Sequence, residues 1–299
     1  MLFLLAMDHR DSLERDVYGI TAEPTASDIA RLEHGKLLVY RGLEAAIDGG
    51  ADAAAAGVLV DERFGAQVAR LATSRGIDLA MPVERSGQKL LVFEYGDDWL
   101  EHVSEFDPDQ VKVLIRDNPD DDPAARRAQL TSLAMLSLVL EEAARSFIIE
   151  LLVPATDAQL ASVDGNALRY DTELRPQLTS RLITEYQANA IEPTIWKIEG
   201  LETAEAAASV VAAARAGART EVRCIVLGRD APIDRLDHWL AIAAATDGFI
   251  GFAIGRSIWE QPLRDHLAGG SESDLVASVA ARYRHFAEVY TAAGVLPTE

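Results

Sequence analysis

The sequence predicts an α/β fold in which eight strands alternate with helices and close into a (β/α)8 barrel of the TIM type. The chain has 299 residues, which suits one such barrel, for which roughly 250 residues are typical. Strand-like and helix-like segments alternate throughout, a pattern that favours a parallel sheet. No shift in composition marks a boundary, so residues 1–299 are expected to form a single domain.

The eight strand candidates are short apolar runs bounded by polar or turn-forming residues. In order they are Leu2–Met7, Gly57–Val60, Asp78–Val83, Val111–Ile115, Ser146–Val153, Thr194–Ile198, Val222–Leu227 and Phe249–Ile254. The first lacks a basic leader and runs directly into Asp8, so it is interpreted as a strand rather than a signal peptide. No stretch approaches the roughly 20 apolar residues of a membrane span.

The helix candidates lie between these strands and after the last one. Their predicted ranges are Ser27–Gly49, Ala66–Arg75, Pro123–Arg145, Leu174–Asn189, Ala204–Ala216, Ile233–Thr246 and Ser273–Ala293. Ser27 is a predicted N-cap and Gly217 a predicted stop. The signal before the fourth strand is weak, with Trp99–His102 as its best candidate, and Lys89–Glu94 reads as a short hairpin arm. A further helix is expected to open after Gly255.

Charge and cysteine content exclude several classes of partner. The net charge of −20 argues against nucleic acid and anionic membranes, because both require a basic face.

The single Cys224 lies in an apolar run and is expected in the core, which fits a reducing cytoplasm. Only His9 among six histidines follows a strand, so no metal site is predicted. No dinucleotide-binding fingerprint follows a strand, and we expect no cofactor.

Active residues of such barrels lie at the carboxyl ends of the strands. In this sequence the predicted ends are rich in ionisable groups and glycines. They are Asp8-His9-Arg10, Asp61-Glu62-Arg63, Glu84-Arg85, Lys112 with Arg116, Glu150, Lys197 with Glu199, Gly228-Arg229-Asp230 and Gly255-Arg256. This clustering predicts an active site rather than a purely structural barrel.

The sixth strand carries a lysine in a chain that contains only Lys36, Lys89, Lys112 and Lys197. Alternation places Lys197 and Glu199 on one face of the strand. A buried lysine can act as a nucleophile, whereas arginine cannot lose its proton. Lys112, also inside a strand, would help to keep the attacking amine unprotonated. The alternative is that these lysines only form ion pairs inside the barrel.

Three further positions extend this hypothesis. Glu150 interrupts an apolar strand and could relay protons with a raised pKa, or pair with a buried lysine, and the two roles are compatible. Gly228 and Gly255 follow strands seven and eight, where barrels often hold phosphate on backbone N–H groups. Arg256 would add a charge-assisted contact to such an anion.

Several motifs occur together in one order along the chain. They are Ala6-Met7-Asp8-His9-Arg10, Leu59–Gly65, Val111–Leu114, Ile149-Glu150, Trp196–Glu199 and Gly251–Trp259. This set resembles the barrel domain fused behind inositol-catabolic sugar kinases, described as a 2-deoxy-5-keto-gluconate 6-phosphate aldolase-like domain. More distantly it resembles the class I tagatose 1,6-bisphosphate aldolases and the sulfosugar-phosphate aldolases. The resemblance covers almost the whole chain.

The resemblance implies a metal-independent aldolase that works through a lysine imine. By position, Lys197 matches the Schiff-base lysine, Glu150 the acid/base glutamate, Lys112 the second lysine and Asp8 a residue near the substrate hydroxyls. The phosphate or sulfonate site of the family matches Gly228, Gly255 and Arg256. The remaining substrate-binding candidates are His9, Arg10 and Glu199.

The sequence departs from the family pattern at two places. His9 stands where tagatose-type enzymes carry glutamine. A serine-containing loop of the family is replaced by Gly228-Arg229-Asp230.

The implied reaction is the reversible cleavage of a ketose phosphate, or a related sugar acid phosphate, to dihydroxyacetone phosphate and an aldehyde. A transaldolase would use the same imine but pass the enamine to an acceptor aldehyde. A non-catalytic, sugar-phosphate-binding regulatory barrel would bind the ligand without forming an imine. The sequence leaves these alternatives, the identity of the sugar and association into a homo-oligomer open.

Overall fold

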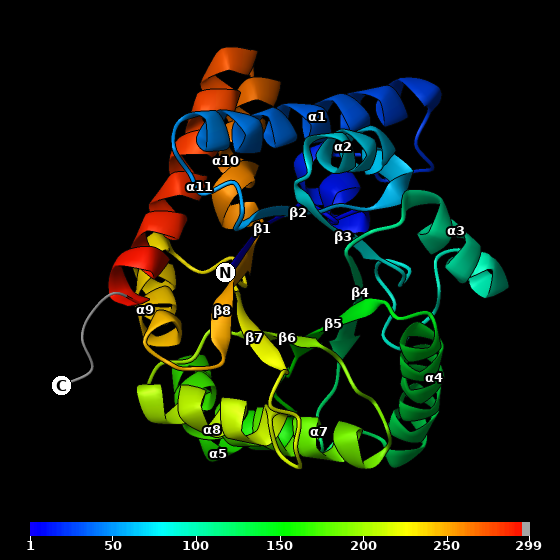
Figure 1. The fold of residues 1–299 in the computed structure, drawn as a ribbon, viewed down its shortest axis with the longest axis vertical. Helices are drawn as coiled ribbons and strands as arrows, with labels where there is room; N and C mark the ends of the chain where they lie inside the picture. Colours follow the sequence, from blue (N-terminus) through cyan, green and yellow to red (C-terminus); the bar gives the residue numbers. More distant parts are fainter. Residues whose placement is uncertain (295–299) are drawn as a thin grey trace.

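The computed structural model describes residues 1–294, whose eight parallel strands close into a barrel in sequence order (Figure 1). The strands are β1 (Leu2–Ala6), β2 (Ala56–Leu59), β3 (Asp78–Pro82), β4 (Gln110–Arg116), β5 (Ser146–Leu152), β6 (Ile195–Glu199), β7 (Arg223–Leu227) and β8 (Phe249–Ile254). The predicted (β/α)8 fold is therefore confirmed. Residues 295–299 of the predicted single domain lie outside the described residues.

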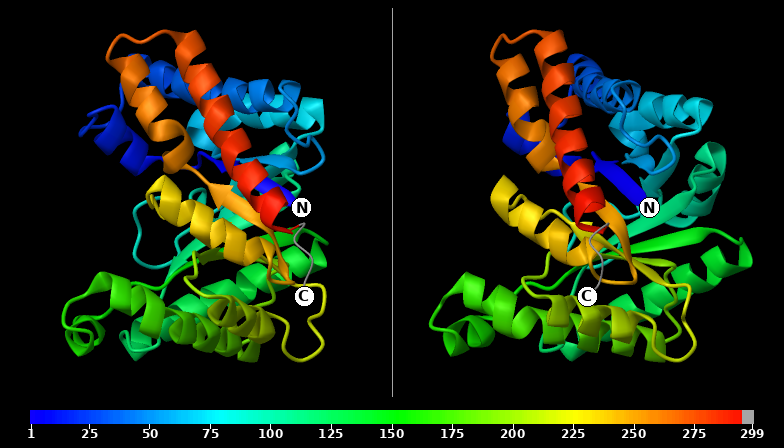
Figure 2. Two further views of the ribbon diagram at one scale, coloured as in Figure 1. Left: turned by 90° about the vertical axis from the view of Figure 1, so that its left-hand side faces the viewer. Right: turned by 60° about the vertical axis from the view of Figure 1, so that its left-hand side comes forward.

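Helices surround the barrel as an outer layer, which the views in Figures 1 and 2 show from three sides. They are α1 (Ala26–Asp48), α2 (Glu62–Arg75), α3 (Trp99–Phe106), α4 (Pro123–Glu142), α5 (Asp157–Ser162), α6 (Ala167–Arg169), α7 (Arg175–Ala188), α8 (Ala204–Ala214), α9 (Ile233–Ala244), α10 (Arg256–Leu267) and α11 (Glu272–Gly294). The long helices α1 and α11 pack against each other beside α10. Within residues 1–294, no helix is long and apolar enough to span a bilayer.

The structure corrects the predicted starts of two helices. The N-cap of α1 is Thr25, not Ser27, because Thr25 and Asp28 form a reciprocal capping box. Helix α2 begins four residues before the predicted Ala66, since the Asp61 carboxylate accepts a hydrogen bond from the backbone N–H of Phe64 at 2.9 Å. In both cases a side-chain cap, rather than the apolar pattern, determines where the helix begins.

Other differences concern loops and helix ends. Helix α8 ends at Ala214, before the predicted stop at Gly217. The short helices α5 and α6, and a π-helical turn at Tyr170–Leu174, fill the connection between β5 and α7 and were not predicted. The predicted hairpin arm forms a single antiparallel bridge, between Phe93 and Glu84.

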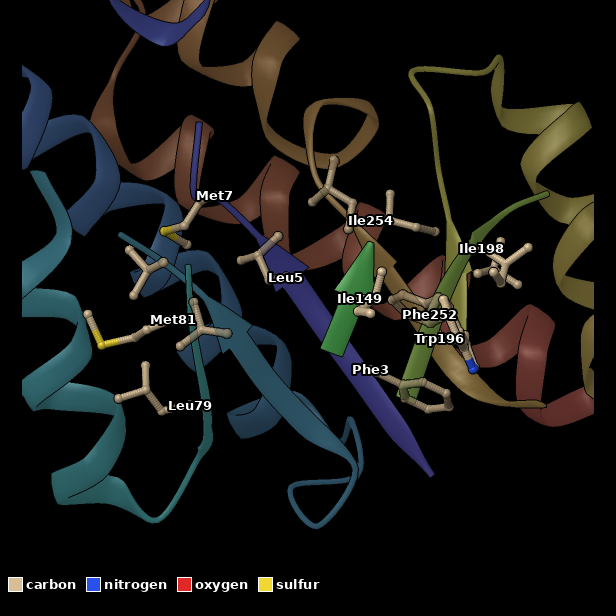
Figure 3. Close-up of a cluster of buried hydrophobic side chains, with 14 of the residues drawn as sticks. Phe3, Leu5, Met7, Leu79, Met81, Ile149, Trp196, Ile198, Phe252 and Ile254 are labelled. Atoms are coloured by element: carbon tan, nitrogen blue, oxygen red, sulfur yellow. The ribbon is translucent and has the colours of Figure 1, made fainter. Parts of the chain in front are cut away.

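Alternate residues of the strands enter two separate apolar layers. The outer layer packs between sheet and helices, and Figure 3 shows part of it, including Phe3 and Phe252. The rings of these two residues stack with their centroids 4.8 Å apart. Cys224 belongs to this layer, as predicted for a core residue. The inner layer closes the floor of the barrel with Leu2, Leu4, Ala6, Leu59, Ala80, Ile148, Ile195, Ile225 and Ala253. The next inward positions along several strands are ionisable, and they form the site described below.

Candidate active site

An ionic layer stands directly on the apolar floor of the barrel. Inward-facing side chains recur every second residue along a strand, so Ile148 of the floor is followed by Glu150 and Ile195 by Lys197. The register of β5 and β6 places Glu150 opposite Lys197. Strand alternation and pairing therefore bring these two side chains together.

Five buried side chains make up the ionic cluster, which consists of Asp8, Glu84, Lys112, Glu150 and Lys197. One oxygen of Glu150 lies 3.0 Å from Nζ of Lys197 and 2.9 Å from Nζ of Lys112. Nζ of Lys112 also donates to Asp8 at 2.7 Å and to Glu84 at 2.8 Å. The structure thus brings together all four predicted catalytic residues and adds Glu84.

The ion pairs within this cluster outweigh burial in setting the pKa values of Glu150, Asp8 and Lys112. Burial alone would raise the pKa of Glu150, as predicted from its apolar strand, but Lys112 and Lys197 hold that pKa below its ordinary value, so the predicted direction is wrong. Burial likewise opposes ionisation of Asp8, yet Lys112 and Lys197 lower its pKa. Burial would lower the pKa of Lys112, but Asp8, Glu150 and Glu84 raise it. Lys112 is thus held as an ammonium group whose charge three carboxylates share.

A cavity of about 260 Å³ opens above the cluster at the carboxyl ends of the strands. Although the chain carries a net charge of −20, basic residues outnumber acidic ones along the walls of this cavity. They are Arg10, Arg85, Lys112, Arg116, Lys197, Arg229 and Arg256, against Asp8, Glu84, Glu150 and Asp230. Such a wall favours an anionic ligand. Within residues 1–294, no group of three or more His, Cys, Asp or Glu side chains is arranged to hold a metal ion.

The loops after β7 and β8 form one end of the cavity, where Gly228, Gly255 and Arg256 all line the wall. Gly255 precedes α10, and a Cβ atom there would lie 2.4 Å from the carbonyl oxygen of Ala6. Only glycine therefore allows this approach to β1. Arg256 forms an ion pair with Asp230, while its Nε is buried without a hydrogen-bond partner among residues 1–294. We call Gly228, Asp230, Gly255 and Arg256 the loop end.

His9 and Arg10 also line the cavity. Burial lowers the pKa of His9 to about 4, with Asp8 opposing this shift, so the imidazole is neutral at pH 7. Its ring packs edge-on against Trp259. Arg10 is held by Glu94 at 3.3 Å and by Glu84 at 3.6 Å.

Glu199 departs from the predicted arrangement. Among residues 1–294, the side chains that line the cavity do not include it. Its carboxylate accepts a hydrogen bond from the backbone N–H of Val153 at 2.9 Å and pairs with Nε of Arg229 at 3.0 Å. Glu199 therefore orients Arg229 instead of facing the cavity. The alternative for the buried lysines is an ion pair of Lys197 with Glu199 or of Lys112 with a carboxylate. Lys197 pairs with Glu150 instead of Glu199, whereas the ion pairing of Lys112 is confirmed.

Sequence reasoning assigned no role to two sets of cavity residues. Glu84 follows the third predicted strand, and its signal is a glutamate at a barrel mouth that also carries Lys112 and Lys197. The loop from Ser86 to Leu91 contributes to the wall, but its sequence carries no periodic signal. Only the chain path, set by the bridge between Phe93 and Glu84, brings this loop over the cavity.

A family model described as "Uncharacterized protein conserved in bacteria (DUF2090)" matches residues 1–294. No curated protein matches the sequence. Several solved structures share the barrel. A fructose-bisphosphate aldolase from Plasmodium falciparum aligns over 99% of this chain and 91% of its own, with 14% identity and a TM-score of 0.66.

Two other structures align over similar lengths. An archaeal fructose 1,6-bisphosphate aldolase covers 97% of this chain and 94% of its own, with 13% identity and a TM-score of 0.58. A Schiff base-forming fructose-1,6-bisphosphate aldolase covers 94% of this chain and 93% of its own, with 14% identity and a TM-score of 0.55. At these identities the likeness establishes the shared fold.

Proposed function

We propose that this chain, which belongs to the DUF2090 family, is a class I aldolase that cleaves a phosphorylated or sulfonated sugar through an imine on Lys197. The observation that carries this proposal is the buried pair of Lys197 and Glu150, 3.0 Å apart at the floor of a basic cavity. Desolvating two charges at this depth is costly. A nucleophilic amine beside its proton acceptor supplies a reason for the arrangement.

The chemistry follows from what each group can reach. The Lys197 amine adds to the ketone carbonyl of the substrate, and loss of water gives a protonated imine. When the C4 hydroxyl loses its proton, the C3–C4 bond breaks, the aldehyde leaves and the electron pair passes to the imine to form an enamine. Protonation at C3 and hydrolysis then release dihydroxyacetone phosphate and regenerate Lys197.

Glu150 is the proposed proton relay for these steps. Its oxygen lies within hydrogen-bond distance of Nζ of Lys197, as a general acid/base requires. Lys112 keeps Glu150 and Asp8 ionised and on the cavity side. Asp8 would then accept a hydrogen bond from a substrate hydroxyl. His9, neutral at pH 7, and Arg10 would contact other parts of the sugar.

The loop end is the proposed site for the phosphate or sulfonate. Arg256 and the start of α10 line the same end of the cavity, and an arginine and a helix N-terminus both attract anions. The solved structures named above include one described as a Schiff base-forming aldolase, which supports the class of reaction. The resemblance to the inositol-catabolic type supports a sugar acid phosphate as one candidate substrate.

Reductive trapping tests this proposal directly. The protein is incubated with dihydroxyacetone phosphate and sodium borohydride, and intact mass spectrometry is followed by peptide mapping. With only four lysines in the chain, the modified position is unambiguous. We expect one adduct on Lys197, loss of the adduct in Lys197→Arg, and an unchanged adduct in Lys89→Arg, which alters an exposed lysine outside the cavity wall.

The other outcomes discriminate between the alternatives. Binding by calorimetry without an adduct would replace the aldolase with a regulatory barrel. An adduct together with turnover that requires an added acceptor aldehyde would indicate a transaldolase. An adduct on Lys112 instead of Lys197 would reverse the assignment of the nucleophile.

A further inference from the structure

A third buried lysine lies behind the cavity wall and takes no part in the ionic cluster. Lys36 belongs to α1 and its side chain is 3% exposed. Its Nζ donates to the carbonyl oxygen of Met7 at 2.7 Å and to that of His9 at 3.1 Å, and it pairs with the carboxylate of Asp61. These three partners match the three donors of an ammonium group.

The partner of Lys36 is equally enclosed. Asp61 is 1% exposed, follows β2, and also accepts the hydrogen bond from Phe64 that caps α2. Burial lowers the pKa of Lys36, and Asp61 opposes this shift. Such a pair gains little net stability over apolar residues of similar volume, so folding alone does not account for it.

The two carbonyl groups held by Lys36 flank Asp8 in the sequence. Residues 7–9 lie just beyond the end of β1 at Ala6, and the N–H of Met7 still donates to the carbonyl oxygen of Leu59 at 2.7 Å. Fixing the carbonyls on both sides leaves the Asp8 carboxylate directed at Lys112, 2.7 Å away. The same contact with its carbonyl anchors His9 at the cavity wall.

We propose that Lys36, held by Asp61, is a positioning residue that aims Asp8 and His9 into the cavity. This inference rests on the proposed aldolase function. Lys36 lies behind these residues and would not touch the substrate itself. Its loss should therefore slow the steps that need Asp8, while the imine on Lys197, whose partner is Glu150, should still form.

The test separates positioning from simple stability. Lys36→Met leaves Asp61 buried without its partner, which is strongly destabilising. The double variant Lys36→Met/Asp61→Asn removes both charges and keeps an amide oxygen to cap α2. We expect this variant to unfold within a few degrees of the wild type and to trap dihydroxyacetone phosphate on Lys197. Its kcat should fall ~10- to 100-fold, as misplacement by about 1 Å can cause.

A second buried ion pair provides the control. Nε of Arg126 lies 2.7 Å from Asp117, and both side chains lie outside the cavity wall. Arg126→Met/Asp117→Asn removes the same number of charges and should leave kcat within about twofold of the wild type. A similar fall in kcat in this control would reduce the effect of Lys36 to a general loss of packing and overturn the positioning role.

Two further outcomes are distinguishable. If the wild type itself forms no adduct on Lys197, the aldolase proposal fails. If the wild type forms the adduct and turns over, but the Lys36→Met/Asp61→Asn variant keeps its kcat within twofold, the positioning role alone fails. Should the double variant not fold, Lys36→Arg keeps the charge but cannot place one compact ammonium between both carbonyls. Unchanged kcat in Lys36→Arg would then contradict the inference.

Discussion

The two ends of the cavity are built in different ways. One end is the ionic cluster at the bottom of the cavity, which we call the floor of the cavity. There Lys112 and Lys197 project from strands, and their side chains are only 2% and 3% exposed. At the loop end, the Arg256 side chain is 35% exposed and that of Asp230 is 41% exposed. Strand pairing fixes the first group, whereas the second depends on loops between strands and helices.

The electrostatics differ in the same way. Nζ of each of these two lysines, Lys112 and Lys197, lies within 3.0 Å of a buried carboxylate. In the loop after β7, Arg229 and the loop-end residue Asp230 adopt positive φ angles of 49° and 53°, respectively, with Arg229 lying between Gly228 and Asp230; this conformation costs energy for residues other than glycine. The floor is preorganised, as charge stabilisation in a transition state requires. The loop end lies on more exposed connections between strands and helices, where binding residues of such barrels are commonly found. We therefore expect substitutions at the floor to change kcat and those at the loop end to change KM.

The sharpest form of this expectation concerns Glu150. Glu150→Gln keeps the size of the side chain but removes the proton acceptor shared by the two lysines. We expect kcat to fall ~10²- to 10⁴-fold, the usual contribution of a general acid/base. Steady-state kinetics at saturating substrate measure this fall, and circular dichroism verifies the fold.

Glu199→Gln is the matched control for that experiment. It alters another buried strand glutamate, two residues from Lys197, that lies outside the cavity and holds Arg229. Its main effect should be on KM, through Arg229. Equal falls in kcat for the two variants would contradict the special role of Glu150 and remove the distinction between the two ends.

This division also explains what the sequence could predict. Lys112, Glu150 and Lys197 were found because a charge inside an apolar strand is conspicuous, and alternation together with register then determines where it points. All eight predicted strands are present, with ends that differ by a residue or so. Where the direction of a side chain follows from the alternation of a strand, the local sequence pattern suffices to predict which residues point into the barrel.

The predictions failed where direction depends on a partner far along the chain. Glu199 shares a strand face with Lys197 by alternation, but as the last residue of β6 it turns toward Arg229 and the backbone of Val153. The sequence assigns no function to Lys36, because its contacts with residues 7–9 arise only when α1 folds back on β1. Neither contact has a signal in a single sequence.

At the loop end, Arg256→Ala tests whether this part of the cavity binds the anion. The loss of a charged hydrogen-bond donor should raise KM for a phosphorylated ketose ~10- to 100-fold, since such bonds contribute about 1.5–3 kcal/mol, with a smaller change in kcat. Arg223→Ala, at the opposite end of β7, is the control for lost positive charge. An equal rise in KM for unphosphorylated ketoses would show that Arg256 does not recognise the anion.

The smallest expected effect concerns Asp230, whose carboxylate already pairs with Arg256. A bound phosphate must compete with this carboxylate, so Asp230→Asn should strengthen the binding of inorganic phosphate. Partly exposed ion pairs contribute at most about 1 kcal/mol, which limits the gain to about fivefold in Kd by calorimetry. Asp247→Asn makes the same charge change before β8, at the other end of the barrel, and should leave Kd unchanged.

Equal gains in phosphate affinity for the two variants would mean that net charge, not the pair with Arg256, controls affinity. Weaker binding in Asp230→Asn would mean that Asp230 holds Arg256 in place for the anion, and the loop end would then be as preorganised as the floor.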